Sequence, residues 1–278
     1  MVPFFGDEHG AGRLLGHLRA LETVADDELI VADNTPDGVA EPALAEAAKV
    51  VRACAERSSY YARNAGAREA SRDWLLFLDA DCAPVPGLLA RYFDPPPDEN
   101  DGLLAGSIAD HPDHDSLLAR YTRSRNFYRG ERGLQASDAG YAPTGNLMVR
   151  RTAFEAVGGF AEAIRSAGDV DLCWRIQAEG WTLTRRPDAL VAHRHREDLP
   201  SFLAMLVRYG AGASWLNRRY PGSSPRWPLS PYELVRSGFD AARHALMGER
   251  DEAAFRLVDA LGLVAHNVGY RSANEIPD

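Results

Sequence analysis

The chain has 278 residues, of which 45% are hydrophobic, and its formal charge of −9 gives it no broad positive surface for nucleic acid. Its three cysteines (Cys54, Cys82 and Cys173) are widely spaced and show no metal-type pairing, which predicts a reduced, cytoplasmic protein. No apolar run reaches the roughly 20 residues that a membrane-spanning helix needs, and no signal-peptide pattern opens the chain. We therefore expect no transmembrane segment and at most peripheral contact with a membrane.

The first two-thirds of the chain alternates short apolar runs with helical patterns. This alternation predicts βαβ units, and hence an α/β fold with a mostly parallel central sheet flanked by helices. In chain order, strands are expected at residues 2–5, 29–32, 50–53, 74–78, 103–108 and 189–192. Helices are expected around residues 14–21 and at 61–70, 152–157 and 169–179.

Beyond residue 199 the alternation stops and helical periodicity takes over, which divides the chain into an α/β domain at 1–198 and a helical C-terminal region at 199–278. One apolar helical face consists of Phe202, Met205, Leu206 and Tyr209. Another consists of Leu257, Leu261, Val264 and Val268. A proline-containing segment at 221–231 links the two helical parts.

An acidic motif, Asp79-Ala80-Asp81, follows the strongly apolar strand at 74–78. In an extended strand residues i and i+2 point the same way, so both carboxylates can converge on one cation, or on a cation and a sugar hydroxyl. Mg²⁺ or Mn²⁺ held there would be completed by phosphate oxygens and water. A solvated strand end would carry the same residues.

Other polar side chains also follow expected strands, at the edge where open α/β sheets bind ligands. Asp33 suits a contact with a ribose or a base, although its neighbours equally form a turn. Arg63, at a helix start, suits a base edge or a phosphate, and a solvated helix is the alternative. His193, in His193-Arg194-His195-Arg196, can complete a metal site, with a solvated basic loop as the alternative.

A second acidic motif, Asp169-Val170-Asp171, opens the helix expected at 169–179. Asp in a first turn is favoured by the helix dipole, which is the structural interpretation. The functional one is a base that deprotonates an acceptor hydroxyl, an effect of roughly 10²–10⁴-fold on the rate. A separate basic cluster contains Arg120, Arg123, Arg125, Arg129 and Arg132. It is expected to be a solvated helix face rather than an anionic acceptor site.

Over residues 2–210 a set of motifs, in this order and spacing, resembles the family-2 glycosyltransferases. The motifs are Val2-Pro3-Phe4-Phe5, Val31-Ala32-Asp33-Asn34, Ala62-Arg63-Asn64-Ala65-Gly66, Phe77-Leu78-Asp79-Ala80-Asp81, Thr144-Gly145-Asn146-Leu147, Val157-Gly158-Gly159-Phe160 and Asp169-Val170-Asp171-Leu172-Cys173-Trp174-Arg175. The resemblance implies a glycosyltransferase A-type fold, with a nucleotide-sugar-binding catalytic domain at 1–198. It also implies an inverting, Mg²⁺- or Mn²⁺-dependent transfer from a nucleotide-diphospho-sugar donor to an unidentified acceptor hydroxyl.

The resemblance also assigns roles to individual residues. Pro3, Asp33 and Arg63 would hold the nucleotide, and Asp79 would meet the ribose or the donor. Asp81 would bind the metal that bridges the diphosphate, with His193 as a further ligand, and Asp169 would be the catalytic base. The residues that would border the sugar or the acceptor are Thr144, Gly145, Asn146, Asp171 and Trp174.

One departure from the family pattern concerns the proposed base. The family usually has Glu before the aspartate that corresponds to Asp169, whereas Gly168 stands there in this chain. Loss of that carboxylate motivates an alternative hypothesis, a catalytically impaired nucleotide-sugar-binding protein. A sugar nucleotidyltransferase is disfavoured, because residues 6–9 (Gly-Asp-Glu-His) are too acidic for a phosphate-binding loop.

Overall fold

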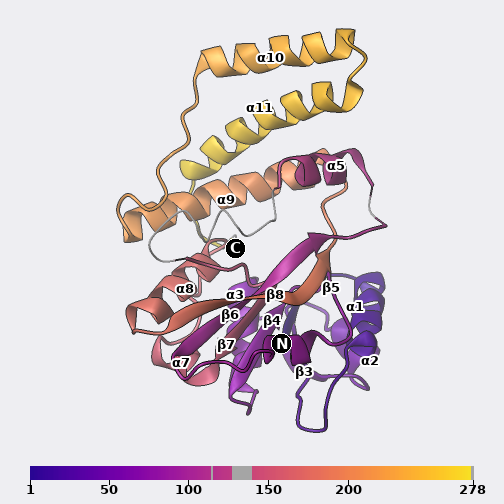
Figure 1. The fold of residues 1–278 in the computed structure, drawn as a ribbon, viewed down its shortest axis with the longest axis vertical. Coiled ribbons are helices and arrows are strands. Elements are labelled where there is room, and N and C mark those ends of the chain that lie inside the picture. Colours follow the sequence, from indigo (N-terminus) through magenta and orange to yellow (C-terminus); the bar gives the residue numbers. More distant parts are fainter. Residues whose placement is uncertain (114, 127–139, 277–278) are drawn as a thin grey trace.

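A computed structural model describes residues 1–113, 115–126 and 140–276 and shows an α/β domain overlaid on one side by long helices (Figure 1). The strands are β1 (Val2–Phe4), β2 (Ile30–Asp33), β3 (Lys49–Arg52), β4 (Trp74–Leu78), β5 (Cys82–Pro84), β6 (Asp101–Asp110), β7 (Asn146–Arg150) and β8 (Thr182–His193). The helices are α1 (Glu8–Ala20), α2 (Ala40–Leu44), α3 (Ser59–Arg68), α4 (Leu88–Tyr92), α5 (Leu117–Ser124), α7 (Arg151–Ala156), α8 (Gly168–Ala178), α9 (Leu199–Arg219), α10 (Pro231–Leu246) and α11 (Arg250–Tyr270).

The strands form one sheet of three strands, ordered β1-β2-β3, and one of five, ordered β4-β7-β6-β8-β5. Two backbone hydrogen bonds join them, because the Met1 nitrogen donates to the Leu76 oxygen (2.8 Å) and the Leu78 nitrogen donates to the Met1 oxygen (3.1 Å). The expected α/β class with flanking helices is confirmed. The sheet is more mixed than expected, since β4–β7, β6–β7 and β5–β8 pair antiparallel while β1–β2, β2–β3 and β6–β8 pair parallel.

Strand β4 shows why the central strands have continuous apolar sequences. Leu76 and Leu78 belong to the hydrophobic cluster that α1, α2 and α4 cover, whereas Leu75 and Phe77 belong to the cluster that α3, α7 and α8 cover. A strand buried on both faces cannot alternate apolar with polar residues. The sheet is therefore the middle layer of three.

The ends of several strands meet at one edge of the sheet. In the parallel register Phe4 pairs with Asp33 and Asp33 with Arg52, so β1, β2 and β3 end at the same level. Strand β4 ends at Leu78, opposite Asn146 where β7 begins. Strand β8 ends at His193, which pairs with Cys82 at the start of β5. The edge formed by these strand ends carries most of the polar motif residues.

The C-terminal helices stack on this domain in the order α9, α11 and α10 (Figure 1). Helices α9 and α11 cross at very short range: a side chain added at Gly210 would begin 2.0 Å from the His266 oxygen, and one at Gly269 would begin 1.8 Å from the Val207 oxygen. Only glycine permits this approach. No helix among residues 1–113, 115–126 and 140–276 is long and apolar enough to cross a membrane.

The two apolar helical faces have different environments. Phe202, Met205 and Leu206 are buried against α5 and α11. Tyr209 is partly exposed, and the whole α11 face of Leu257, Leu261, Val264 and Val268 is exposed. Helix α11 packs instead through residues such as Val258 and Ala265. Periodicity thus identified a helix, but α11 buries a different face from the one expected, and that face includes Phe255.

Candidate active site

The Asp79-Ala80-Asp81 motif forms a turn between β4 and β5. The Cys82 nitrogen donates to the Asp79 oxygen (3.0 Å), which closes the turn. The backbone is therefore not extended here, and the strand geometry behind the expected convergence does not hold. A cation at one carboxylate and a sugar hydroxyl at the other stays a prediction. The two side chains diverge, Asp79 toward Arg63 and Asp81 toward His193.

Asp79 forms an ion pair with the buried Arg63 of α3. The Arg63 guanidinium donates to Asp79 Oδ1 at 2.5 Å, while Asp79 keeps 38% of its side chain exposed. Arg63 lies beside the rings of Tyr60 and Phe160, and its Nε is buried without a hydrogen-bond partner among the described residues. A buried guanidinium with an unpaired N–H, next to a partly exposed carboxylate, can bind a further polar group of a ligand.

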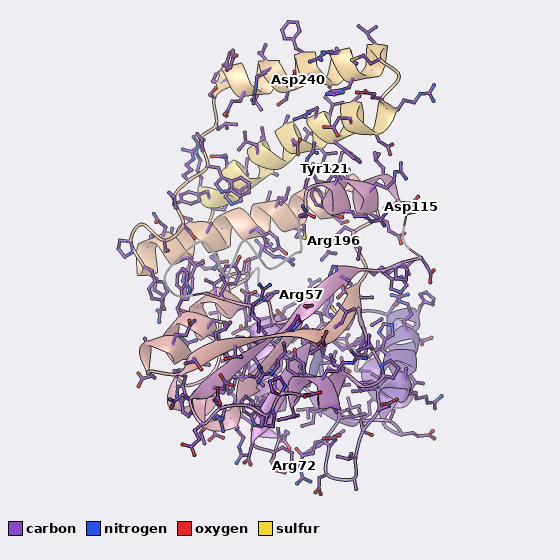
Figure 2. The ribbon with its side chains drawn as sticks, viewed as in Figure 1. Arg57, Arg72, Asp115, Tyr121, Arg196 and Asp240 are labelled. Atoms are coloured by element: carbon purple, nitrogen blue, oxygen red, sulfur yellow. The ribbon has the colours of Figure 1, made fainter. Side chains whose placement is uncertain are left out.

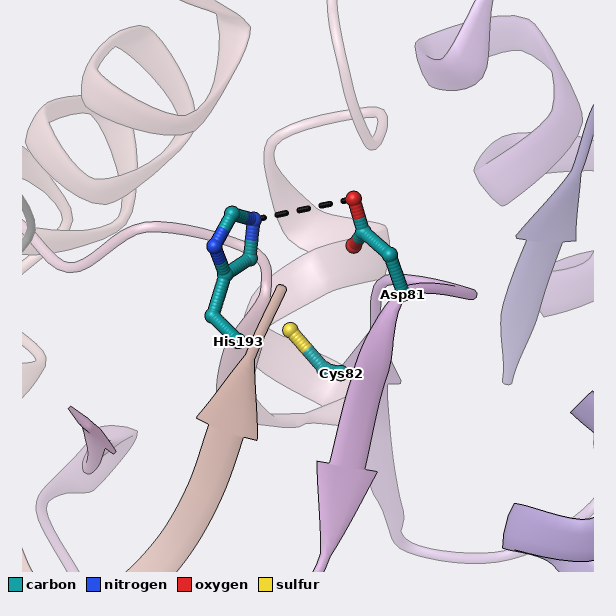
Figure 3. Close-up of side chains that lie close together, drawn as sticks. All are labelled: Asp81, Cys82 and His193. Atoms are coloured by element: carbon teal, nitrogen blue, oxygen red, sulfur yellow. Dashed lines mark ion pairs between the residues drawn. The ribbon is translucent and has the colours of Figure 1, made fainter. Parts of the chain in front are cut away.

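Asp81, Cys82 and His193 form a cluster whose potential ligand atoms all lie within 4.8 Å of one another (Figure 3). His193 Nε2 is 3.6 Å from Asp81 Oδ2, and Cys82 pairs with His193 across β5 and β8. Burial raises the pKa of the Cys82 thiol well above its usual value. Burial also raises the pKa of Asp81, opposed by His193. The Asp81 carboxylate and the His193 imidazole are a donor pair that fits Mn²⁺, and Mg²⁺ less well because Mg²⁺ prefers oxygen ligands.

Asp169 lies in the first turn of α8, as expected, and reaches the same region. It is half-buried, and burial raises its pKa, opposed by the Val170 backbone and the charge of Arg63. Its charge contributes, after burial, to the raised pKa of Tyr60 and Tyr141. Side chains of α3 and α8 therefore meet beside the acidic turn.

Tyr60, which belongs to none of the sequence motifs, explains why glycine precedes Asp169. A side chain added at Gly168 would begin 2.8 Å from the Tyr60 ring. That ring is 7% exposed and stacks on Phe160 with centroids 5.6 Å apart. Tyr60 thus fills the space where the family's Glu would begin. No local pattern could reveal this, because the contact joins residues 108 positions apart.

The turn before β7 also reaches the site. Thr144 is buried, and a side chain added at Gly145 would begin 3.2 Å from Asp79 Oδ2 and 3.6 Å from Cys82 Sγ. The absence of a side chain at Gly145 keeps the space beside Asp79 open. The expected contact of Thr144 and Gly145 with the sugar or the acceptor stays a prediction.

Asn146 does not face this site, contrary to expectation. It is fully buried, its amide nitrogen donates to the Ser107 and Ala189 oxygens (2.9 and 2.8 Å), and its oxygen accepts from the Tyr92 hydroxyl (2.7 Å). All its polar groups are used to hold β6, β7 and β8 together. The residue is a structural amide of the sheet.

Asp171 and Trp174 are likewise occupied elsewhere. Asp171 is fully buried and pairs with Arg175 of its own helix and with Arg219 of α9, each at 2.8 Å. The Trp174 ring packs edge-on against Tyr220, with centroids 5.1 Å apart. Both residues therefore join α8 to the end of α9 instead of bordering a substrate.

Asp33 is also engaged within the protein. Its carboxylate accepts hydrogen bonds from Thr35 (nitrogen and hydroxyl) and from the Ala40 nitrogen, and pairs with Arg52 at 2.7 Å. It is fully buried and shapes the loop after β2. Pro3 lies in β1, level with Ala32 of β2, and is half-buried.

In the described part of the arginine cluster Arg123 is exposed, as expected of a solvated face, whereas two other arginines pair with α11. Arg120 pairs with Asp251 at 2.7 Å, and Arg125 pairs with Asp259 at 2.8 Å, both on α11. These arginines fasten α5 to α11. Arg129 and Arg132 lie outside the described residues.

Comparison with known proteins identifies the family. Residues 1–158 match the model of glycosyl transferase family 2. The pre-mycofactocin glycosyltransferase of Mycobacterium tuberculosis is 32% identical over 244 residues, covering 84% of this chain and 50% of that protein. The glycosyltransferase AglE of Haloferax volcanii is 32% identical over 142 residues, covering 51% of this chain and 46% of that protein. The chain thus spans about half the length of these relatives.

Two solved structures show the same fold. The mannosyltransferase PcManGT of Pyrobaculum calidifontis, in complex with GDP-Man and Mn²⁺, has a TM-score of 0.66 at 17% identity and covers 97% of this chain and 85% of that one. Glucosyl-3-phosphoglycerate synthase of Mycobacterium tuberculosis, in complex with Mn²⁺ and UDP-glucose, has a TM-score of 0.51 at 20% identity, covering 78% and 77%. The expected glycosyltransferase A-type fold is confirmed. The chain belongs to glycosyl transferase family 2.

Proposed function

We propose that this protein is a metal-dependent, inverting glycosyltransferase that moves a sugar from a nucleotide-diphospho-sugar to an acceptor hydroxyl. The observation that carries the proposal is the convergence of the Asp79–Arg63 pair, the Asp81–His193 pair and Asp169 at one sheet edge. The first two suit a nucleotide diphosphate and a divalent cation, and the third suits proton abstraction. Relatives bound to Mn²⁺ and nucleotide sugars support the donor class.

On the side of the nucleotide sugar, Asp79 accepts a hydrogen bond from a hydroxyl of that substrate, while Arg63 holds the Asp79 carboxylate in place. Asp81 and His193 hold Mg²⁺ or Mn²⁺, which when bound stabilises the negative charge of the departing diphosphate. Arg196 (Figure 2) is exposed and near enough to lower the pKa of Asp81, so its charge also favours that diphosphate.

The nucleotide end of the donor lies over the first three strands. Asp33 and Arg52 hold the loop after β2 in place, and Pro3 contributes to the floor beside it. In this proposal Asp33 acts through the loop that it shapes. The structure favours this positioning role because the carboxylate already accepts four hydrogen bonds.

Asp169 acts as the base in this proposal. Its carboxylate takes the proton from the acceptor hydroxyl as the acceptor oxygen attacks the anomeric carbon, and the nucleoside diphosphate leaves from the opposite face. The reaction therefore inverts the anomeric centre. The raised pKa of Asp169 makes this carboxylate a stronger base than an exposed aspartate.

A thermal-shift screen of UDP-, GDP- and TDP-sugars, with and without Mn²⁺, tests donor binding. We expect one donor to raise Tm only with the metal, and Asp81→Asn to remove that metal-dependent shift. Absence of any metal-dependent shift in the wild type contradicts the proposal.

Transfer to a hydroxyl, or slow donor hydrolysis, then separates an enzyme from a binding protein. We expect Asp169→Asn to keep the donor-induced shift and to lose about 10²–10⁴-fold in rate. An equal background rate in wild type and Asp169→Asn would favour the alternative suggested by Gly168, a catalytically impaired nucleotide-sugar-binding protein.

A further inference from the structure

One face of α9 is directed at α8 and the site. Gly212 packs on the loop before α8, because a side chain added there would begin 2.8 Å from Ser166 and 3.0 Å from Ala167. Trp215 packs into the hydrophobic cluster beneath α8, and Arg219 pairs with Asp171. Positions 212, 215 and 219 are three and four residues apart, so they share one helical face.

Arg208 is the next position of this face, one turn before Gly212. Arg219 contacts α8 at Asp171 and Gly212 contacts the loop before α8, so Arg208 lies beyond the start of α8, on the side of the site. Its charge reaches Tyr60, the residue beneath Gly168. The adjacent Tyr209 has its pKa raised to about 12 by burial, with Asp169 and Asp79 also raising it and Arg208 opposing.

Arg208 differs from three other arginines near the site, because among the described residues it has no ion pair or hydrogen bond. Arg63, Arg175 and Arg219 each pair with an aspartate. Arg208 is half-buried, yet among the described residues no carboxylate lies within ion-pair distance and none of its nitrogens donates a hydrogen bond. Partial burial of an unpaired guanidinium is costly, and an anionic ligand compensates that cost.

We propose that Arg208 binds an anionic group, a carboxylate or a phosphate, on the acceptor substrate. The inference rests on the proposed glycosyl transfer and specifies its acceptor: one molecule carries both the hydroxyl presented to Asp169 and the anion bound by Arg208. Tyr209 lines the space between them. Helix α9 of the C-terminal region thereby contributes to acceptor selection.

The test uses the full chain saturated with Mn²⁺ and the nucleoside diphosphate that binds, so that added anions cannot occupy the diphosphate site. Glycerol 3-phosphate and glycerate supply the two anions, and glycerol is the neutral control on the same carbon skeleton. Affinities are measured by titration calorimetry at constant ionic strength. We expect at least one anion to bind and glycerol not to bind, and the anion that binds identifies the group.

Arg208→Gln should weaken the binding of that anion by about tenfold or more, because it removes a charge-assisted hydrogen bond. Arg208→Lys should retain part of the affinity, since it keeps the charge but loses the planar fork. Arg243→Gln removes one exposed charge on α10 and is the matched control. Nucleotide binding, measured for each variant, reports whether the protein is folded.

Three outcomes overturn the inference: no anion binds the wild type, glycerol binds equally well, or Arg208→Gln binds the anion like the wild type. Each is distinct from failure of the proposed function, which appears earlier as absence of metal-dependent nucleotide binding. Retention of nucleotide binding together with any of the three outcomes removes the acceptor inference alone.

Discussion

Gly168→Ala offers a sharp test of the packing that surrounds the proposed base. The new methyl group would lie 2.8 Å from Tyr60 ring carbons. The ring cannot withdraw easily, since it is 7% exposed and stacked on Phe160. Either the ring or the start of α8 must shift, and Asp169 would move with the helix.

Two effects of opposite sign determine the stability change. Overpacking a filled core typically costs about 1–3 kcal/mol. Replacing a helical glycine by alanine ordinarily gains about 0.5–1 kcal/mol. The clash is the larger effect, so we expect Gly168→Ala to lower the free energy of unfolding by about 1–2 kcal/mol.

Urea denaturation of a matched set of variants provides the measurement. Gly12→Ala is the control, because Gly12 is exposed in α1 with no atom near an added side chain, and it should gain about 0.5–1 kcal/mol. In the Tyr60→Leu background the cost of Gly168→Ala should fall by at least about 0.5 kcal/mol, the signature of direct contact. A stabilised Gly168→Ala, or a cost unchanged by Tyr60→Leu, would refute the packing argument.

Asn146→Ala should lower the free energy of unfolding by about 2–4 kcal/mol, because it strands the Tyr92 hydroxyl and two carbonyls; a urea midpoint like the wild type's would restore Asn146 as a substrate residue. Transfer activity should decline with acid at a pH above the usual aspartate range, because burial raises the pKa of Asp169; a pH–rate profile with its acid limb near 3.8 would contradict this. Because the pKa of Asp169 is higher in the folded than in the unfolded protein, its ionisation lowers the free energy of unfolding as the pH rises. Asp169→Asn should therefore stabilise the protein at pH 7 but not below about pH 4, as measured by urea denaturation at both pH values. Arg125→Gln should cost about 0.5–1 kcal/mol at low salt and less at high salt, since its pairing with Asp259 is partly exposed; a salt-independent cost would point to packing instead.

The sequence could predict the strands that are buried on both faces, such as residues 74–78, because their apolar runs are continuous. It missed β5 and β7 for a physical reason. Strand β5 is only Cys82-Ala83-Pro84, and β7 begins at Asn146, a polar residue that is buried only because β6 and β8 supply its hydrogen-bond partners. These two strands account for the antiparallel pairs of the five-stranded sheet.

For the candidate site, the motifs identified polar residues that lie at one edge of the sheet, but they did not give the direction of each side chain. Asp79 and Asp81 diverge because the chain turns there, and a turn is not visible in the spacing i, i+2. Tyr60 resembles an ordinary helical aromatic residue in the sequence. Its role depends on Gly168, the first residue of α8, which is distant in the sequence and which only the fold brings against the Tyr60 ring.

The two carboxylates of the second acidic motif, Asp169 and Asp171, also point in different directions, and helical geometry gives the reason. Successive residues of a helix are rotated by about 100°, so Asp169 and Asp171 lie on nearly opposite sides of α8. Asp169 points toward Arg63 and Tyr60, whereas Asp171 pairs with Arg219 near the end of α9. That buried ion pair, with Gly212 packed on Ala167, fixes the rotation of α9 about its own axis. The rotation in turn directs Arg208 toward the site. Asp169 is therefore proposed to react with the acceptor, and Asp171 holds helix α9, which is proposed to select that acceptor.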